Sequence, residues 1–70
     1  MIYKVGDIIV FEDSPIRLYE VVRVDDYYKE YILNMIYPNK QPAVRYFSTM
    51  HRYARLATET ELILYGSNKK

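Results

Sequence analysis

Cysteine is absent from the 70 residues, so the fold has neither a disulfide framework nor a thiolate zinc site. The single histidine, His51, has no carboxylate beside it in the sequence, and a surface turn explains it better than a metal site or a nucleophile–base pair. The two glycines, Gly6 and Gly66, are too few for a glycine-rich phosphate loop. We therefore expect no catalytic residue, no metal, no cofactor and no enzyme activity.

Long apolar runs are also absent. No segment approaches the roughly 20 apolar residues that cross a bilayer, and residues 1–7, Met-Ile-Tyr-Lys-Val-Gly-Asp, lack the apolar core of a signal peptide. Hydrophobic residues nevertheless make up 50% of the chain, which argues against disorder. We expect one small domain over residues 1–66, a disordered tail over residues 67–70, a cytoplasmic location and no membrane contact.

Charge is unevenly distributed along a chain whose formal net charge is only +1. Residues 1–30 hold seven acidic and four basic residues, residues 31–58 hold four basic residues and no acidic one, and residues 59–70 are balanced. This is not the polycation expected of a strong nucleic-acid binder, and its opposite-signed halves favour a polar or charged partner. The nine tyrosines suit both strands and binding surfaces.

The expected fold is organised around residues 17–25, Arg-Leu-Tyr-Glu-Val-Val-Arg-Val-Asp. Tyr19 and Val21 lie on one face of an ideal strand, and Val22 and Val24 lie on the other. A straight strand that buried all four would also bury a charged neighbour, and an unpaired buried charge is very costly. A bulge or a sharp bend near Val21–Val22 removes this conflict. A bent central strand in a short chain favours a small, strongly curved barrel.

Apolar runs between turn residues predict the other elements. We expect strands over residues 8–11, 16–24, 31–37, 43–49 and 52–57, with turns at residues 12–15 and 48–51 and a loop at residues 38–42. Val44 and Tyr46 are expected to point inward from the fourth strand, and Ala54 and Leu56 from the fifth. Both faces of the third strand are mostly apolar, so its inner face stays open.

Three turn and cap signals accompany these strands. Gly6 can adopt the positive φ of the first turn, and Asp25 or Asp26 is expected to adopt the left-handed conformation in the second hairpin, which lacks glycine. Thr58 and Glu61 have the spacing of a capping box, which predicts a helical turn that ends at Gly66.

Residues 5–10, Val-Gly-Asp-Ile-Ile-Val, and residues 19–24, Tyr-Glu-Val-Val-Arg-Val, form an opening similar to that of Tudor-type and KOW-type barrels. The ending over residues 53–62 looks like that of small phage and bacterial proteins in which a strand continues into a capped helix. Together these segments resemble the SH3-like small-barrel class. The resemblance implies an all-β fold, a five-stranded SH3-like barrel with a short C-terminal helical turn, and it implies no particular function.

The best candidate for a partner-binding site is the basic and aromatic segment 45–55, Arg-Tyr-Phe-Ser-Thr-Met-His-Arg-Tyr-Ala-Arg. Guanidinium groups can grip phosphates while rings stack on bases, and arginine and tyrosine are also enriched at protein–protein hot spots. The competing interpretation is that the rings cover a thin core and the arginines are solvated or paired with the acidic first half. The expected outer face of two adjacent strands gives the candidate residues Arg45, Phe47, Tyr53 and Arg55. Arg52, in the same segment, is a further candidate. Tyr27 and Tyr28, at the tip of a hairpin, form a second candidate group.

The resulting expectation is a non-catalytic binding module. The first hypothesis is a small accessory protein, such as phages encode, that docks on a larger host protein through this Tyr/Arg surface. The second is a nucleic-acid-binding barrel that uses the same residues. A third is a homo-oligomer formed by strand-edge pairing, because residues 43–49 carry few charges that would prevent it.

Overall fold

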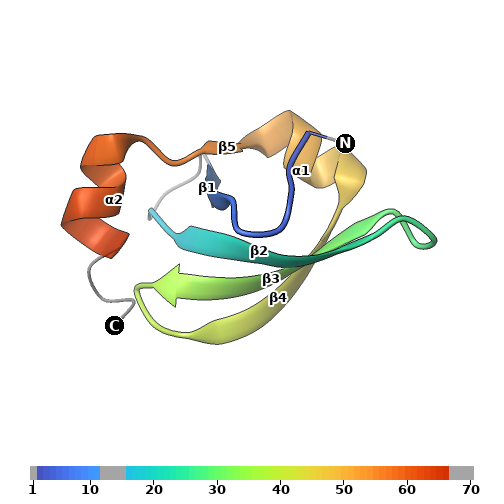
Figure 1. Cartoon of the computed structure of the whole chain (residues 1–70), viewed down its shortest axis with the longest axis horizontal. Coiled ribbons are helices and arrows are strands. Elements are labelled where there is room, and N and C mark those ends of the chain that lie inside the picture. Colours follow the sequence, from blue (N-terminus) through green and yellow to red (C-terminus); the bar gives the residue numbers. More distant parts are fainter. Residues whose placement is uncertain (1, 12–15, 67–70) are drawn as a thin grey trace.

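The structure, a computed structural model, describes residues 2–11 and 16–66 and contains a five-stranded antiparallel sheet with two short helices (Figure 1). The strand order is β4-β3-β2-β1-β5. The predicted turn at 12–15 and tail at 67–70 lie outside the described residues. The elements are β1 (Ile8–Phe11), β2 (Leu18–Asp25), β3 (Glu30–Tyr37), β4 (Gln41–Tyr46), α1 (Phe47–Tyr53), β5 (Ala54–Leu56) and α2 (Glu59–Tyr65).

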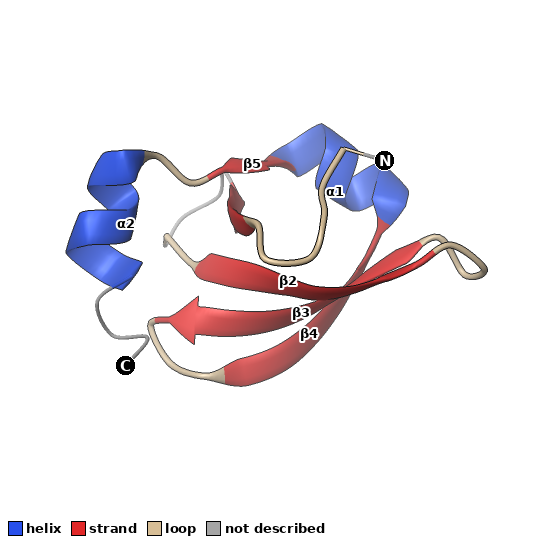
Figure 2. Ribbon diagram, viewed as in Figure 1, coloured by secondary structure: helices blue, strands red, loops and turns tan. Residues whose placement is uncertain are grey.

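The sheet is strongly curved but is not closed, because β4 pairs only with β3, and β5 only with β1, within the described residues. Figure 2 shows α1 and β5 lying across the core from β3 and β4. A direct measure of the curvature is that the guanidinium carbon of Arg45, on β4, lies 5.7 Å from the ring centroid of Phe11, on β1. The mainly β architecture with five strands is thus confirmed, whereas closure into a barrel is not.

The inner face of the sheet holds the larger of two hydrophobic clusters. Alternate residues of neighbouring strands form its rows; one such row is Val21, Leu33 and Ala43. Burial of this face is a major source of stability for the described part of the chain, because it removes large apolar side chains from water. Its buried members are Tyr3, Ile9, Phe11, Tyr19, Val21, Tyr31, Leu33, Met35 and Met50.

The predicted bulge lies in β2 at the expected place. The register between β2 and β3 shifts between Val21 and Arg23, so Val22 is the extra residue of the bulge. Val22 is 44% exposed, whereas Val21 is fully buried and Val24 packs against the larger cluster. The bulge therefore restores the inward direction of Val24 and leaves one valine outside.

The two apolar faces of β3 serve two different clusters. Tyr31, Leu33 and Met35 point into the larger cluster, whereas Ile36 belongs to a smaller cluster on the outer face. Helix α2 lies over the second cluster through Tyr65, whose ring centroid is 4.7 Å from that of Tyr37. The outer face of β3 is apolar at this end because a helix packs against it.

The predicted strand over residues 43–49 is wrong in its second half, and so is the turn at 48–51. Helix α1 begins at Phe47, directly after β4, and its residue Met50 is fully buried while Phe47 packs against the same cluster. The spacing of Phe47 and Met50 places both on one face of a helix, and burial of both decides against an extended chain. As a result, β5 is limited to Ala54–Leu56 instead of 52–57.

The predicted inner face of β5 is confirmed, since Ala54 and Leu56 share rows with the core residues Phe11 and Ile9, although Leu56 is 56% exposed. The predicted inner face of β4 is wrong, because Val44 and Tyr46 are 47% and 62% exposed. The register pairs Ala43 with Leu33 and Arg45 with Tyr31, both of which face the core. Two apolar residues that alternate with an alanine and an arginine are thus on the solvent side of an edge strand, where only one face of the sheet is covered.

The turn and cap predictions have mixed outcomes. Gly6 has a φ of +96°, and Asp7 accepts a hydrogen bond from the backbone N–H of Lys4, as a capped turn requires. In the β2–β3 hairpin the residue with positive φ is Lys29, at 59°, and not Asp25 or Asp26 as predicted. Asp25 instead accepts two backbone N–H hydrogen bonds within the hairpin loop.

The C-terminal signals of the sequence are confirmed. The Thr58 side chain accepts from the backbone N–H of Glu61, and the Glu61 side chain accepts from the backbone N–H of Thr58, so the capping box is complete. Helix α2 ends before Gly66.

Candidate ligand groove

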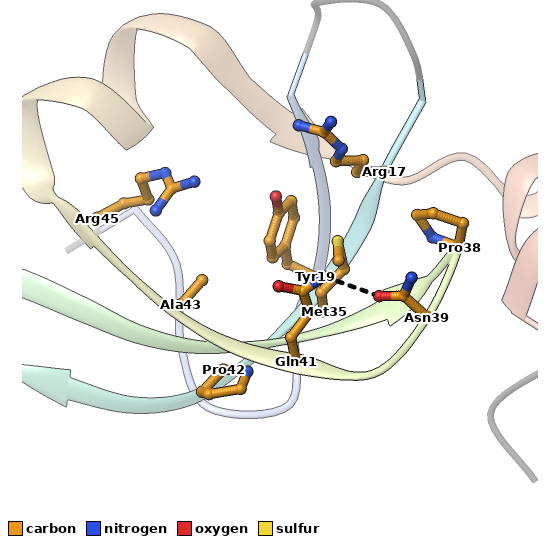
Figure 3. Close-up of a pocket in the computed structure, with 9 residues that line it drawn as sticks. All are labelled: Arg17, Tyr19, Met35, Pro38, Asn39, Gln41, Pro42, Ala43 and Arg45. Carbon is orange, nitrogen blue, oxygen red and sulfur yellow. Dashed lines mark hydrogen bonds between the residues drawn. The ribbon is translucent and has the colours of Figure 1, made fainter.

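An open groove of about 410 Å³ lies between the start of β2, the end of β3 and the inner side of β4 (Figure 3). Its volume falls within the range of small-ligand and peptide sites. The β3–β4 loop closes one end with Pro38 and Asn39. The lining residues are Arg17, Tyr19, Met35, Pro38, Asn39, Gln41, Pro42, Ala43 and Arg45.

The floor of the groove is apolar with a polar point at its centre. Tyr19 and Met35 are adjacent in the register of β2 and β3 and are only 4% and 6% exposed. The Tyr19 ring packs edge-on against Phe11, with centroids 5.3 Å apart. Figure 3 shows the Tyr19 hydroxyl pointing to the same side of the groove as the two guanidinium groups. The groove therefore offers a hydroxyl and a thioether, and not the face of an aromatic ring.

Among the described residues, the rim of the groove carries two positive charges and no negative one, because Arg17 and Arg45 are the only charged side chains of this part of the chain that line it. Arg45 donates to the carbonyl oxygen of Val44 at 2.8 Å and lies over the Phe11 ring, so its guanidinium is held in place without a carboxylate. Within residues 2–11 and 16–66 neither arginine forms an ion pair. This arrangement can attract an anionic group.

Two amide side chains complete the groove. The Gln41 amide nitrogen donates to Asn39 Oδ1 at 2.8 Å. This hydrogen bond leaves the Gln41 oxygen and the Asn39 nitrogen available to a ligand. The accessible lining of the groove is therefore mainly polar, with hydrogen-bond donors and acceptors around a small apolar floor.

The predicted binding face does not exist as one surface. Arg45 shares a row with Tyr31 on the inner face, whereas Arg55 shares a row with Val10 and Leu18 on the outer face, at the opposite edge of the sheet. The prediction failed because it placed residues 43–49 and 52–57 on adjacent strands and expected Arg45 and Phe47, which lie on the core side, to point outward. Phe47 packs in the core against Tyr31, with ring centroids 4.7 Å apart.

Arg55 is engaged in the C-terminal capping box. Its guanidinium donates to both carboxylate oxygens of Glu61, at 2.9 and 2.8 Å. The hydrogen bonds from Arg55, helped by the Thr58 backbone N–H, lower the pKa of Glu61 to about 2. Arg55 therefore has a structural partner, as the competing interpretation of the sequence allowed.

The remaining predicted residues form two separate exposed groups. Arg52 and Tyr53 lie on α1, where they line a shallow hollow together with Ser48, Thr49 and His51. His51 is exposed, and its Nε2 atom lies 2.9 Å from the hydroxyl of the buried Tyr31.

The second exposed group is the tip of the β2–β3 hairpin, which extends away from the body of the protein (Figure 1). Tyr27 and Tyr28 are 84% and 64% exposed there, and their rings contact each other edge-on with centroids 4.8 Å apart. The tip lies at the opposite end of β3 from the groove. These rings therefore do not contribute to the groove.

Sequence reasoning found Arg45 and missed the rest of the groove. Arg45 was predicted as a binding residue because it lies in segment 31–58, which has no acidic residue. Arg17 lies in the acidic part of the chain, and Tyr19 and Met35 have the pattern of ordinary core residues. The register of β2, β3 and β4 together with the curvature of the sheet brings these four residues to one groove. The sequence predicted a loop over residues 38–42, which holds Asn39 and Gln41 between two prolines, and in the structure Gln41 and Pro42 begin β4.

No group of three His, Asp or Glu side chains within residues 2–11 and 16–66 is placed to hold a metal ion. No helix in the described part of the chain is long and apolar enough to span a membrane.

Comparison of the chain with protein-family models, with curated proteins and with solved structures gave no match.

Proposed function

We propose that this protein is a non-catalytic binding module that docks on a protein partner through the Arg17–Arg45 groove. The observation that carries the proposal is that two arginines without a carboxylate partner, among the described residues, lie over an apolar floor in an open groove. Charged side chains at a protein surface are usually solvated or paired with one another. A pair of cations held beside buried tyrosine and methionine side chains is better explained by an anionic partner.

The fold that we propose for this module is an SH3-like small barrel. Three observations support it: the bulge in β2, the meander from β1 to β4, and the pairing of β5 with β1 on the side away from β2. The contact between Arg45 and Phe11 spans strands that are separated by two others, which is the curvature that a small barrel needs.

The geometry favours a protein partner over a nucleic acid. Sequence-tolerant binding of single strands combines cations with ring faces on which bases stack. In the groove the Tyr19 ring is buried against Phe11, and the exposed rings of Tyr27 and Tyr28 lie on the distant hairpin tip. Among the described residues no exposed ring face lines the groove, whereas its two guanidinium groups and its amide side chains would match a carboxylate and backbone groups of a protein.

The test is affinity capture from a lysate with and without nuclease, using three forms of the protein. Arg17→Gln with Arg45→Gln removes both groove cations. Lys4→Gln with Arg52→Gln is the matched control, since it removes the same number of positive charges away from the groove. We expect nuclease-resistant capture by the wild type and the control, and a loss of about tenfold or more in the groove variant.

Two outcomes would contradict the proposal. Equal capture by the groove variant and the control would show that the groove does not bind the partner. Capture that disappears with nuclease, falls steeply with salt and depends on Arg52 and Tyr53 would instead support the second hypothesis, a nucleic-acid interface. That alternative rests on the exposed cation and ring that lie side by side in sequence on α1.

A further inference from the structure

Strand β4 presents an unpaired edge directly beside the groove. It is the first strand in the order β4-β3-β2-β1-β5 and pairs only with β3 within the described residues. The same strand supplies Gln41, Ala43 and Arg45 to the groove. Any chain that paired with this edge would place every second side chain at the mouth of the groove.

The phase of the ladder identifies the backbone groups that point to the open side. The N–H of Phe47 donates to the carbonyl of Lys29 at 2.8 Å, continuing the β3–β4 pairing by one residue. Hydrogen-bonded and non-bonded pairs alternate in an antiparallel ladder. Arg45 and Ala43 are therefore bonded to β3, and Pro42, Val44 and Tyr46 direct their backbone groups outward. The position of Pro42 agrees with this phase, because a proline has no N–H to donate.

Arg45 connects this open edge to the groove. Its guanidinium donates at 2.8 Å to the carbonyl of Val44, one of the outward-facing acceptors. The guanidinium therefore occupies the place that a partner strand's N–H would take. An acidic side chain near Arg45 can draw the guanidinium away from Val44, because a carboxylate is a stronger acceptor for a guanidinium than a neutral carbonyl is.

We infer that the protein partner presents an extended acidic segment that pairs with the free edge of β4 as an additional strand. This inference rests on the proposed function of the groove. The segment exchanges hydrogen bonds with the backbone of Val44 and Tyr46. One of its carboxylates binds Arg45, and a second, on the same face, extends into the groove toward Arg17. This is strand addition, with the backbone providing affinity and the two arginines providing selectivity.

Charge selects this occupant over a second copy of the chain. The sequence of β4, Gln-Pro-Ala-Val-Arg-Tyr, has one charged residue, Arg45. Pairing two copies of β4 would bring two arginines to one edge and offer no carboxylate to displace either guanidinium from Val44. Pro42 would remove one donor from each copy. An acidic strand has neither disadvantage.

The experiment uses a short acetylated and amidated peptide in which Glu and Val alternate, added at millimolar concentration to the full chain. Amide hydrogen exchange is followed by NMR at Val44 and Tyr46, and Arg45, whose N–H is already in the ladder, is the internal reference. We expect bound peptide to slow exchange at Val44 and Tyr46 by about tenfold or more and to leave Arg45 unchanged.

Three matched controls test the separate parts of the inference. A peptide with Gln in place of Glu should bind the wild type about tenfold more weakly, and Arg45→Gln should abolish that preference. A Glu-Val peptide N-methylated on the residues that face β4 should also bind about tenfold more weakly, because it cannot donate those backbone hydrogen bonds. Val44→Pro removes only an outward N–H, so it should fold normally and still weaken binding, whereas Ala43→Pro breaks the ladder with β3 and should unfold the domain.

The inference is overturned if the acidic peptide fails to protect Val44 and Tyr46, or if N-methylation and Val44→Pro leave its affinity unchanged. In either case lysate capture that still depends on Arg17 and Arg45 would leave the proposed function standing without strand addition. Loss of that dependence as well would end both proposals. Protection of these amides in protein without peptide, together with dimers in light scattering, would show that a second copy occupies the edge.

Discussion

The Arg55 guanidinium donates to both carboxylate oxygens of Glu61 and so joins β5 to the first turn of α2 through two hydrogen bonds of 2.9 and 2.8 Å. The same carboxylate accepts the backbone N–H of Thr58. Glu61 thus completes the helix cap and also binds Arg55, which the sequence alone predicted to be a partner-binding residue. Arg55 is therefore a residue of the fold.

The first prediction concerns Glu61→Gln. We expect the substitution to lower the free energy of unfolding at neutral pH by about 1 kcal/mol, because it weakens a capping interaction and a half-exposed ion pair. The pKa of Glu61 is lowered from 4.5 to about 2 in the folded protein. Its contribution is consequently complete above the ordinary pKa of a glutamate and is lost as the pH falls toward 2.

Urea unfolding of the wild type and of Glu61→Gln between neutral pH and pH 2 measures this contribution. The two stabilities should converge in acid, because the protonated carboxyl no longer binds Arg55. Glu59→Gln, in the same helical turn, is the control and should change stability by only a few tenths of a kcal/mol. A difference between wild type and Glu61→Gln that stays constant with pH would contradict the ion pair.

The second prediction tests the β2 bulge with two adjacent valines. Val21→Asp should lower the free energy of unfolding by about 3 kcal/mol or more, enough to unfold a domain of this size, because it buries an unpaired charge. Val22→Asp should change it by about 0.5 kcal/mol or less, since Val22 is the exposed residue of the bulge. Circular dichroism during urea unfolding distinguishes them, and similar losses in both variants would mean that the strand has no bulge there.

The third prediction compares the two glycines. Gly6 has a φ of +96°, although a Cβ there would meet no atom within 4 Å. Gly6→Ala should therefore destabilise through backbone strain alone, by about 1–2 kcal/mol. Gly66, with a φ of −73°, is in an ordinary helical conformation. Gly66→Ala should be neutral or stabilise by up to about 1 kcal/mol, and thermal unfolding of both variants checks the contrast.

The fourth prediction concerns the buried hydroxyl of Tyr31. It lies 2.9 Å from His51 Nε2 and accepts the backbone N–H of Tyr3 at 3.4 Å. Tyr31→Phe leaves both groups without this partner and should lower the free energy of unfolding by about 1–2 kcal/mol. Tyr27→Phe, at the exposed hairpin tip, is the control with no expected effect. Equal stability of the two variants would show that the hydroxyl does not hold α1 against the N-terminal segment.

The parts of the fold that the sequence predicted correctly depend on neighbouring residues. The bulge follows from a phase change within β2, the capping box from the spacing of Thr58 and Glu61, and the first turn from Gly6. Each of these features arises from interactions between residues that are close in the chain. Local steric contacts and local hydrogen bonds therefore determine it. The approximate places of the five strands followed from apolar segments between turn residues, although the fourth and fifth were predicted to include residues of α1.

The faces of the outer strands required the tertiary structure. Val44 and Tyr46 look like inward residues until β4 is known to be an edge strand, and Phe47 reads as part of a strand until Met50 is found buried beneath α1. Alternation alone gives two equivalent faces. Which of them is buried depends on what packs against it, and that neighbour is distant in the sequence.

The composition of the candidate site was decided in the same way. The amino-acid sequence by itself determined a small antiparallel β domain, its bent second strand and its capped C-terminal helix, because these are set by contacts between near neighbours. Only the curvature and register of the sheet brought Arg17 beside Arg45 and separated Arg45 from Arg55. Those placements depend on long-range pairing, in which a shift of one residue moves every side chain of a strand to the opposite face.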